Sequence, residues 1–240
     1  MAPSKSQFPI KGFLPVTLLD WPGKIAAMIF TGGCNFRCRF CYNRELVENP
    51  EILPDIDEKT IFDHLENKKN WLDGLVISGG EPTIYSDLAT FCQKVKKRGF
   101  KIQLQTNGTN PQMLKKLIKE KLVDCIAMDI KGPLNKYQQI TGTKVDLEQI
   151  KKSLAIIKKN PQVEVEFRTT FVPGLLNKND AKKIAQLLKG QTAPYFLQQF
   201  RPQKTLDRKL QKQKPYLKND LEKIKEIVKK FKIKVEIRGV

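Results

Sequence analysis

Residues 25–41 read IAAMIFTGGCNFRCRFC and join a short apolar run to a loop that contains three cysteines. The apolar run, Ile25–Phe30, is typical of a strand that is buried on both faces of a parallel sheet. Cys34, Cys38 and Cys41 follow it in a CxxxCxxC pattern. Three thiolates cannot complete the coordination of a four-coordinate metal centre. A [4Fe–4S] cluster bound in this way therefore keeps one iron without a protein ligand.

A structural zinc site is the alternative interpretation of this loop, and it needs a fourth ligand. Only Cys92, Cys125 and His64 remain as candidates. Cys92 falls on the apolar face of a predicted helix and Cys125 begins a predicted buried strand, so we expect both to be small core residues. His64, the only histidine, lies in a polar helix pattern, which disfavours hydrolytic zinc chemistry and a Ser/His triad. We therefore favour the iron–sulfur cluster.

The composition is that of a globular protein from a reducing compartment. Of 240 residues, 40% are hydrophobic and 29% are charged, and no apolar stretch has the length of a membrane span. The N-terminus leads into no apolar segment of a secretory signal. Five cysteines, three of them clustered, favour metal binding over a disulfide framework. We expect a cytoplasmic protein without a membrane partner.

The formal net charge of +19 comes from lysines that are scattered through the predicted helices. We interpret them as solvent-exposed residues of these helices. The alternative is an electrostatic field that attracts an acidic partner, a nucleotide or RNA. Because no RNA-binding motif accompanies the charge, we expect no nucleic-acid partner.

Strand and helix patterns alternate along the chain after residue 24. Strands are predicted at 25–30, 75–78, 101–105, 124–128, 163–172, 195–200 and 233–237. Helices are predicted at 58–69, 86–98, from 111 onward, and at 147–157, 180–189 and 221–231. Six strands that are each followed by a helix predict an α/β fold with a parallel sheet. Six units are too few for a closed eightfold barrel. We therefore predict a partial, open six-unit βα barrel over residues 25–240, with a lateral mouth, after an irregular lead-in over residues 1–24.

Polar and glycine-rich segments follow the predicted strands, at the edge where α/β folds place ligands. The clearest of them is Gly79-Gly80-Glu81-Pro82. Glycines let a backbone approach a ligand closely, and a carboxylate at a strand end can pair with an ammonium group. An ordinary tight turn is the alternative. Next to a cluster with an open iron, this segment suggests S-adenosylmethionine, whose amine and carboxylate would chelate that iron.

The cysteine loop, with the aromatic Phe40 before the third cysteine, and the GGEP motif together resemble the radical S-adenosylmethionine (radical SAM) superfamily. The segments LDWPGK, TNGT, MDIKGP, YQQITG, FRTTFVPG and QQFRP extend the resemblance over nearly the whole chain. They are similar to the activating enzymes of glycyl radical enzymes, in particular to the longer type of anaerobic ribonucleoside-triphosphate reductase activating protein. Related activases share most of these motifs.

The resemblance implies roles for twelve residues. The cluster ligands would be Cys34, Cys38 and Cys41. The residues that bind S-adenosylmethionine would be Phe40, Gly79, Gly80, Glu81, Thr106, Asn107 and Asp129. Residues with a catalytic role would be Lys131 and Arg168, the latter near the target peptide.

Two further positions depart from pyruvate formate-lyase activase. Gln105 stands where that relative has an aspartate, so a monovalent-cation site is in doubt. Arg201 stands where it has a histidine, which would change how the target peptide is recognised. For Asp129 and Lys131, and for Arg168 with Glu166, structural ion pairs are the alternative interpretation.

The activity implied by the resemblance is that of an oxidoreductase. One electron from a low-potential donor such as flavodoxin or ferredoxin cleaves the S–C5′ bond of S-adenosylmethionine, giving methionine and a 5′-deoxyadenosyl radical. That radical removes a hydrogen from a glycine Cα of a partner protein, here anaerobic ribonucleoside-triphosphate reductase. Gly79 follows Cys41 by 38 positions without another cysteine, so the ferredoxin-like insertion of some activases is absent from this interval.

Three other functions stay open. The first is activation of pyruvate formate-lyase or another glycyl radical enzyme. The second is a small-molecule radical SAM reaction, such as that of 7-carboxy-7-deazaguanine synthase. The third is a basic metal-binding protein that binds RNA or a partner without catalysis.

Overall fold

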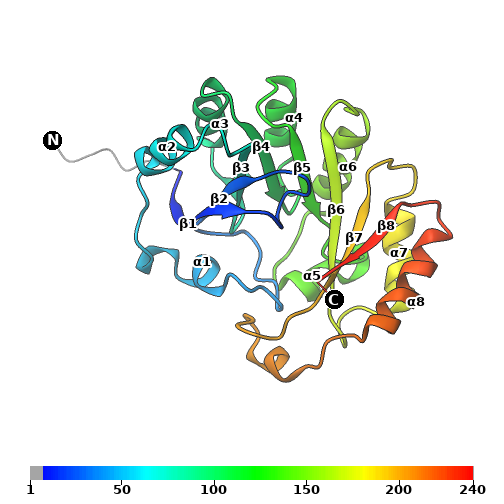
Figure 1. The fold of residues 1–240 in the computed structure, drawn as a ribbon. Helices are drawn as coiled ribbons and strands as arrows, with labels where there is room; N and C mark the ends of the chain where they lie inside the picture. The colour runs from blue at the N-terminus through cyan, green and yellow to red at the C-terminus, as the bar shows by residue number, and fades with distance from the viewer. Residues whose placement is uncertain (1–7, 240) are drawn as a thin grey trace.

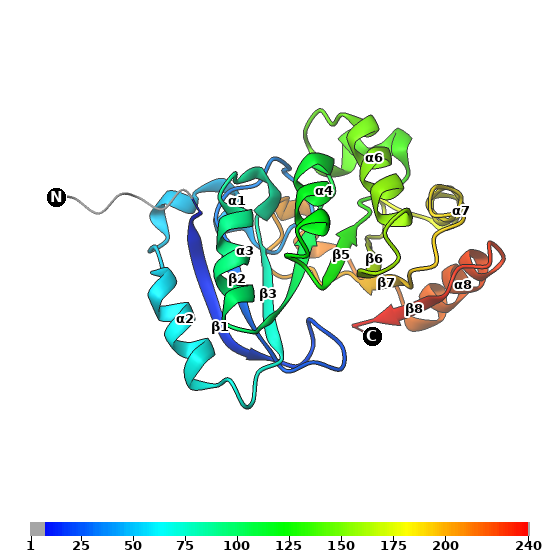
Figure 2. The ribbon, with the colours of Figure 1, turned by 90° about the horizontal axis from the view of Figure 1, so that it is seen from above.

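The computed structural model describes residues 8–239 and contains one sheet of eight strands in sequence order (Figures 1 and 2). The strands are β1 (Ile10–Thr17), β2 (Ala26–Thr31), β3 (Gly74–Gly79), β4 (Lys101–Thr106), β5 (Cys125–Asp129), β6 (Glu164–Phe171), β7 (Tyr195–Gln199) and β8 (Val235–Arg238). Strands β2 to β8 are parallel, and β1 is antiparallel to β2. Because β1 and β8 are not paired with each other, the sheet is an open barrel, as predicted.

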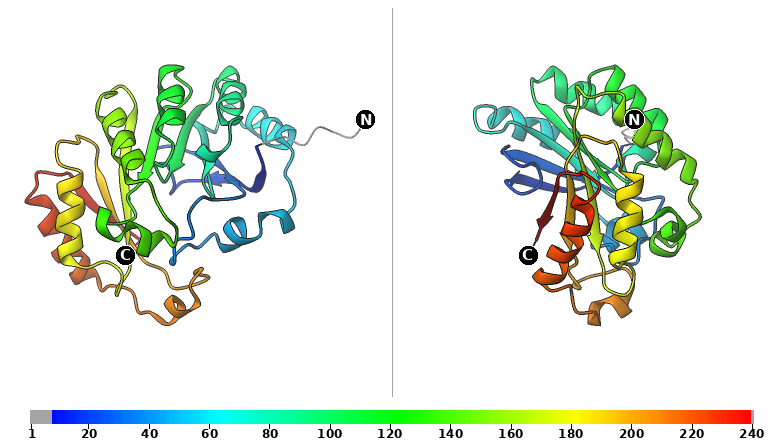
Figure 3. Two further views of the ribbon diagram at one scale, coloured as in Figure 1. Left: turned by 180° about the vertical axis from the view of Figure 1, so that it is seen from behind. Right: turned by 90° about the vertical axis from the view of Figure 1, so that its right-hand side faces the viewer.

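Helices follow the strands and cover the outer side of the curved sheet (Figure 3). The helices are α1 (Arg44–Glu48), α2 (Glu58–Asn67), α3 (Leu88–Lys97), α4 (Pro111–Lys119), α5 (Tyr137–Thr141), α6 (Leu147–Lys158), α7 (Lys178–Leu187) and α8 (Lys218–Lys229). Short 3₁₀ turns are η1 (Pro50–Ile52), η2 (Pro82–Ile84), η3 (Leu134–Lys136) and η4 (Arg208–Lys212). None of the helices within residues 8–239 is long and apolar enough to cross a membrane.

The two faces of the sheet bury different sets of residues, because side chains alternate along a strand. In β2, Ala27 and Ile29 belong to the large core under the helices, whereas Ala26 and Met28 belong to a small inner cluster. This double burial explains the continuous apolar run that predicted the strand.

The prediction of an irregular lead-in is wrong for Ile10–Thr17, which form β1. Residues 1–7 lie outside the described part of the chain. Prolines made a strand unexpected here, but β1 is an edge strand, where a missing N–H is tolerated. The β1–β2 register shifts between Leu14 and Thr17, around Pro15. The Pro15 carbonyl lies 3.0 Å from Nε2 of His64, on α2.

Trp21, from the LDWPGK segment, closes the inner side of the barrel. It is 3% exposed and packs with Ala26, Met28, Val76 and Cys125 in the inner cluster. The indole therefore fills the interior beneath the ends of the strands that carry the polar residues.

We predict that Trp21→Ala lowers the free energy of unfolding by about 3–5 kcal/mol, because it leaves a large cavity. Trp71→Ala is the matched control, since Trp71 is 75% exposed and its loss should change the stability by less than about 0.5 kcal/mol. Denaturant unfolding followed by circular dichroism measures both. Equal effects of the two substitutions would contradict the role of Trp21.

Candidate active site

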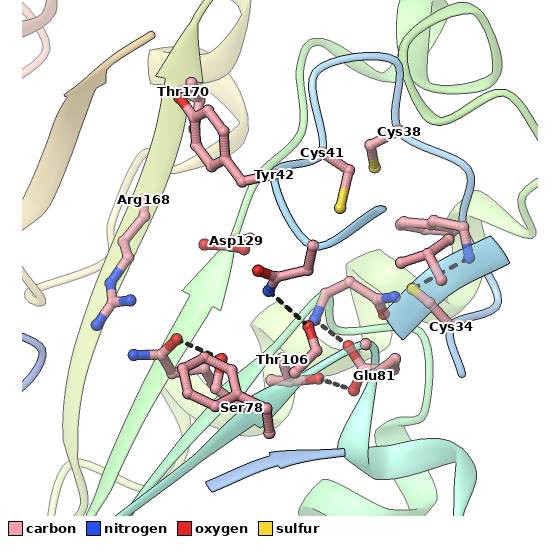
Figure 4. Close-up of a pocket in the computed structure, with 18 of the residues that line it drawn as sticks. Cys34, Cys38, Cys41, Tyr42, Ser78, Glu81, Thr106, Asp129, Arg168 and Thr170 are labelled. Atoms are coloured by element: carbon pink, nitrogen blue, oxygen red, sulfur yellow. Dashed lines mark hydrogen bonds between the residues drawn. The ribbon is translucent and has the colours of Figure 1, made fainter. Parts of the chain in front are cut away.

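All twelve predicted site residues line one cavity of about 360 Å³ at the C-terminal ends of the strands (Figure 4). The three cysteines and Phe40 come from the loop after β2. Arg168 comes from the middle of β6, and the other residues come from the ends of β3, β4 and β5 or the loops that follow them. Parallel strands bring their C-terminal ends to one edge, so residues far apart in sequence meet there. The structure therefore brings together every residue of the predicted site, while the role of each stays a prediction.

The thiols of Cys34, Cys38 and Cys41 are free and face this cavity (Figure 4). No group of three or more His, Cys, Asp or Glu side chains within residues 8–239 is placed to hold a single metal ion. A [4Fe–4S] cluster takes one thiolate on each of three different irons, so its ligands need not converge on one point. The other candidate zinc ligands, Cys92, Cys125 and His64, do not line the cavity.

Burial raises the pKa of all three thiols. The pKa of Cys34 rises to about 12 and that of Cys38 to about 11, and the pKa of Cys41 is also raised. Without a cluster these groups are therefore protonated at neutral pH, and iron must displace their protons when it binds.

The backbone of the three-cysteine loop (residues 32–41) is anchored on one side by α5. The N–H of Arg37 donates to the Thr141 carbonyl at 2.7 Å, and that of Arg39 donates to the Ile140 carbonyl at 3.2 Å. These carbonyls are at the C-terminal end of α5, where helix carbonyls have no partner within the helix. A Cβ on Gly142, which has a φ of +67°, would lie 2.7 Å from the Arg37 carbonyl oxygen. The YQQITG motif therefore supports the loop.

A second anchor comes from the segment between β7 and α8. The Leu206 N–H donates to the Cys41 carbonyl at 3.1 Å, and the Asp207 N–H donates to the Arg39 carbonyl at 2.8 Å. The guanidinium of Arg39 also pairs with the Asp207 carboxylate, at 2.9 and 2.7 Å. Sequence reasoning missed this anchor because nothing local marks these residues as neighbours of the cysteines.

The Gly-Gly segment at the end of β3 packs directly on the start of the loop. The Gly80 N–H donates to the Thr31 carbonyl at 2.8 Å, and the Glu81 N–H donates to the Gly33 carbonyl at 2.9 Å. A Cβ on Gly80 would lie only 1.7 Å from the Gly33 oxygen, and one on Gly79, at a φ of +122°, 2.1 Å from the Thr31 nitrogen. Both positions therefore require glycine.

The Glu81 carboxylate is 1% exposed and is held by protein donors. One oxygen accepts from the Thr83 hydroxyl at 2.5 Å and the Thr106 hydroxyl at 2.6 Å, and the other from the Asn107 N–H at 2.6 Å. Burial raises the pKa of Glu81, and these hydrogen bonds act in the opposite direction. Glu81 thus joins the ends of β3 and β4, and its contact with a ligand amine stays a prediction.

Asn107 links the end of β4 to the three-cysteine loop. The side-chain N–H group of Asn107 donates to Oδ1 of Asn35 at 2.8 Å, and Oδ1 of Asn107 accepts from the Thr109 hydroxyl at 2.7 Å. The left-handed turn residue of this segment is Gly108, with a φ of +76°. The side chain of Asn107 therefore has a role in the site beyond shaping a turn.

Asp129 and Lys131 form an ion pair at 2.8 Å on the cavity wall. Burial lowers the pKa of Lys131, but the charge of Asp129 and its hydrogen bond to Lys131 act in the opposite direction, and the pKa lies above its ordinary value. The Lys131 N–H donates to the Tyr137 hydroxyl at 3.2 Å. Asp129 and Lys131 both line the cavity, so they can form this ion pair and still face a bound ligand.

Arg168 lines the cavity and pairs with Glu166, which confirms the buried ion pair considered from the sequence. Glu166 also accepts from Arg238 of β8 at 3.0 and 2.7 Å, and the Arg238 guanidinium stacks over the Phe196 ring. Two guanidinium groups therefore share one carboxylate. Arg238 was not predicted, because its contact with Glu166 crosses β7 from the last strand, far along the sequence.

A second cavity of about 770 Å³ adjoins the first, and the two share the lining residues Asp20, Tyr42, Arg168, Thr170 and Gln198. Arg201 lines the second cavity, and its N–H donates to the Tyr42 hydroxyl at 2.6 Å. Thr170 could have been found from its alternation with Arg168 along β6. Gln105 accepts a hydrogen bond from the Ser78 hydroxyl at 2.8 Å, so its side-chain oxygen has a neutral partner.

Comparison with known proteins agrees with this geometry. Residues 28–188 match the family model described as the radical SAM superfamily. The chain belongs to the radical SAM superfamily. This radical SAM enzyme uses a [4Fe–4S] cluster and S-adenosylmethionine, and the three thiols and the adjoining cavity fit that pair of groups. Cys34, Cys38 and Cys41 would hold the cluster.

Three relatives describe how far the likeness reaches. The radical SAM enzyme is 34% identical over 236 residues, 96% of each chain, to a Methanocaldococcus jannaschii protein named as a glycyl-radical enzyme activating enzyme. It is 32% identical over 142 residues, 58% of this chain and 56% of the relative, to 7-carboxy-7-deazaguanine synthase of Rickettsia prowazekii. The crystal structure of QueE from Escherichia coli shares the fold, with a TM-score of 0.59, 16% identity, and coverage of 97% of this chain and 94% of that one.

We predict that Cys38→Ala abolishes cluster binding but leaves the fold intact, because it removes only one sulfur atom from the core cluster to which Cys38 belongs. Iron content and visible absorbance after anaerobic reconstitution measure the cluster, and far-UV circular dichroism measures the fold. Cys92→Ala is the control, since Cys92 is buried on α3 outside the cavity. Global unfolding of the Cys38 variant would instead indicate a structural metal site.

Proposed function

We propose that this radical SAM enzyme activates a glycyl radical enzyme, and that its target is anaerobic ribonucleoside-triphosphate reductase. The observation that carries the proposal is the likeness, over 96% of both chains, to the protein named as a glycyl-radical enzyme activating enzyme. The target follows from the LDWPGK segment, which resembles the longer type of reductase-activating protein. In the structure this segment supplies Asp20 to both cavities and Trp21 to the barrel interior.

The size and position of the second cavity support a substrate that enters from the side. It connects with the first cavity and is lined by Leu19 of the lead-in segment and by Arg238 and Gly239 at the end of the chain. Leu19 follows the edge strand β1, and Arg238 and Gly239 lie at the end of the edge strand β8, so these residues mark the two edges between which the open barrel has no wall. A loop of a partner protein could thus reach the site without opening the fold.

The interval between the third cysteine and the Gly-Gly segment supports an activase with a single cluster. It contains α1, η1, α2 and most of β3. Helix α2 packs on β1, and the Leu46 carbonyl of α1 accepts from the Gly33 N–H. None of its residues is a cysteine after Cys41. Activases with a ferredoxin-like insertion at this place are therefore poor models for this protein.

We propose a role for each group of residues that line the first cavity. Bound S-adenosylmethionine and the cluster would supply a carbon radical, and the protein would orient it and exclude water. Adenine would lie against the backbone around Phe40, and the methionyl amine beside Gly79, Gly80 and Glu81. Thr106, Asn107 and Asp129 would complete the binding of S-adenosylmethionine. Lys131 and Arg168 would place its charged groups relative to the target glycine.

A small-molecule reaction is the second candidate, because the likeness to 7-carboxy-7-deazaguanine synthase is also above 30%. That likeness spans only 58% of this chain. Activation of pyruvate formate-lyase or another glycyl radical enzyme would use the same cavity. A basic metal-binding protein without catalysis would lack reductive cleavage of S-adenosylmethionine altogether.

We predict a glycyl radical on the reductase when reconstituted enzyme, S-adenosylmethionine, a reductant and anaerobic ribonucleoside-triphosphate reductase are incubated without oxygen. Electron paramagnetic resonance detects it as a doublet. Pyruvate formate-lyase in place of the reductase is the control for target choice. A doublet on pyruvate formate-lyase alone would show that pyruvate formate-lyase, not the reductase, is the target. A doublet on neither protein, with 5′-deoxyadenosine still formed, would favour a small-molecule substrate.

We predict that Arg168→Lys lowers glycyl radical formation roughly hundredfold, because a misplaced contact next to the reacting atoms has that effect. Lysine keeps the positive charge beside Glu166 but loses the planar donors of the guanidinium. Uncoupled 5′-deoxyadenosine formation should change much less. If both rates fell equally, Arg168 would act on S-adenosylmethionine rather than on the target.

A further inference from the structure

A strongly basic segment lies directly on the three-cysteine loop. Residues 201–214, RPQKTLDRKLQKQK, connect β7 to α8 and carry six cationic side chains and one carboxylate. The carboxylate, Asp207, is paired with Arg39 of the loop. In the part of the chain that the structure describes, none of the six cations has a carboxylate within 4.0 Å. The segment thus presents unneutralised positive charge.

The segment is fixed to the cluster site by its backbone. The Leu206 N–H donates to the carbonyl of Cys41, so one hydrogen bond separates the segment from a cluster ligand residue. Thr205 and Leu210 are buried and hold the segment down, whereas Arg208, Lys209 and Lys212 are exposed. Figure 1 shows the segment in orange beside the loop after β2.

A radical SAM enzyme needs one electron for each cleavage. In the three-cysteine loop Cys38 is buried, and Cys34 and Cys41 are half-buried. The rate of electron transfer falls steeply with distance, so a donor protein must dock close to the three-cysteine loop. Within the segment only Arg201 and Gln203 line the second cavity, and η4 lines neither that cavity nor the first. A protein on η4 would therefore leave the substrate entrance accessible.

We propose that residues 204–214, the part of this segment that does not line the second cavity, are the docking surface for an acidic one-electron carrier protein of the ferredoxin or flavodoxin class. The carrier is oxidised by one electron and the cluster is reduced by one, without transfer of an atom. Unpaired cations attract an acidic carrier from a distance and orient it, which raises its association rate. The inference rests on membership of the radical SAM superfamily and not on the identity of the target enzyme.

The first test measures binding. The triple variant Arg208→Glu, Lys209→Glu, Lys212→Glu should bind the probe, an isolated flavodoxin or ferredoxin, more weakly. Its Kd should rise about tenfold at low salt. High salt should remove the difference, because exposed charges are screened. The matched control is Lys115→Glu, Lys116→Glu, Lys119→Glu on α4, which makes the same change in charge at exposed positions without ion pairs. Binding is measured with holoenzyme and with cluster-free protein.

The second test measures 5′-deoxyadenosine formed by holoenzyme without a glycyl radical enzyme. With the carrier as reductant, the segment variant should be about tenfold slower than wild type and the α4 variant unchanged. With excess dithionite, for which docking is not required, all three proteins should react alike. Slow reaction of the segment variant with both reductants, or normal reaction with the carrier, would overturn the proposal.

Nucleic acid is the competing occupant of a basic surface. Fluorescence anisotropy with a labelled RNA oligonucleotide tests it on the same three proteins. Loss of RNA binding in the segment variant alone, together with unchanged carrier binding, would assign the surface to RNA and overturn the proposal. Equal RNA binding by all three proteins, together with the loss of carrier binding in the segment variant, supports it.

Discussion

The site depends on how the backbone of the three-cysteine loop is satisfied. Buried N–H and C=O groups need partners, and a loop that must present three thiols to a cavity cannot pair its backbone as a helix or strand does. Here the partners come from elsewhere, namely the end of β3, the carbonyls of α5 and residues 206–207. The position of the thiols is thus set by three segments that are distant in sequence.

The same logic explains the polar residues in the barrel interior. Trp21 and its apolar neighbours occupy one part of the interior, and ionic and amide side chains occupy the remainder. Burying charge is costly unless it is paired. Asp129 is paired with Lys131, and Glu166 with two arginines, so the wall can stay charged next to the cavity. A preorganised polar wall of this kind suits a ligand with an amine and a carboxylate.

Much of this arrangement could be predicted from the sequence, because it depends on patterns of neighbouring residues. Parallel strands, their order and the gathering of polar residues at strand ends follow from apolar runs and from the geometry of βα units. The strand β1 could not be predicted, since its proline, Pro15, is permitted only by the place of β1 at an edge. The contact of Asp207 with Arg39 and that of Arg238 with Glu166 join residues 168 and 72 positions apart, and no local pattern signals them.

The two anchors of the cysteine loop also order events during biosynthesis. Each strand pairs with its neighbour in sequence, so the sheet can grow from the N-terminus as the chain leaves the ribosome. The carbonyls of α5 and the N–H groups of residues 206 and 207 become available only after five and seven strands have emerged. Cys34, Cys38 and Cys41 are thus translated early, but the loop that carries them is anchored late. We expect iron to bind them most readily when the chain is nearly complete.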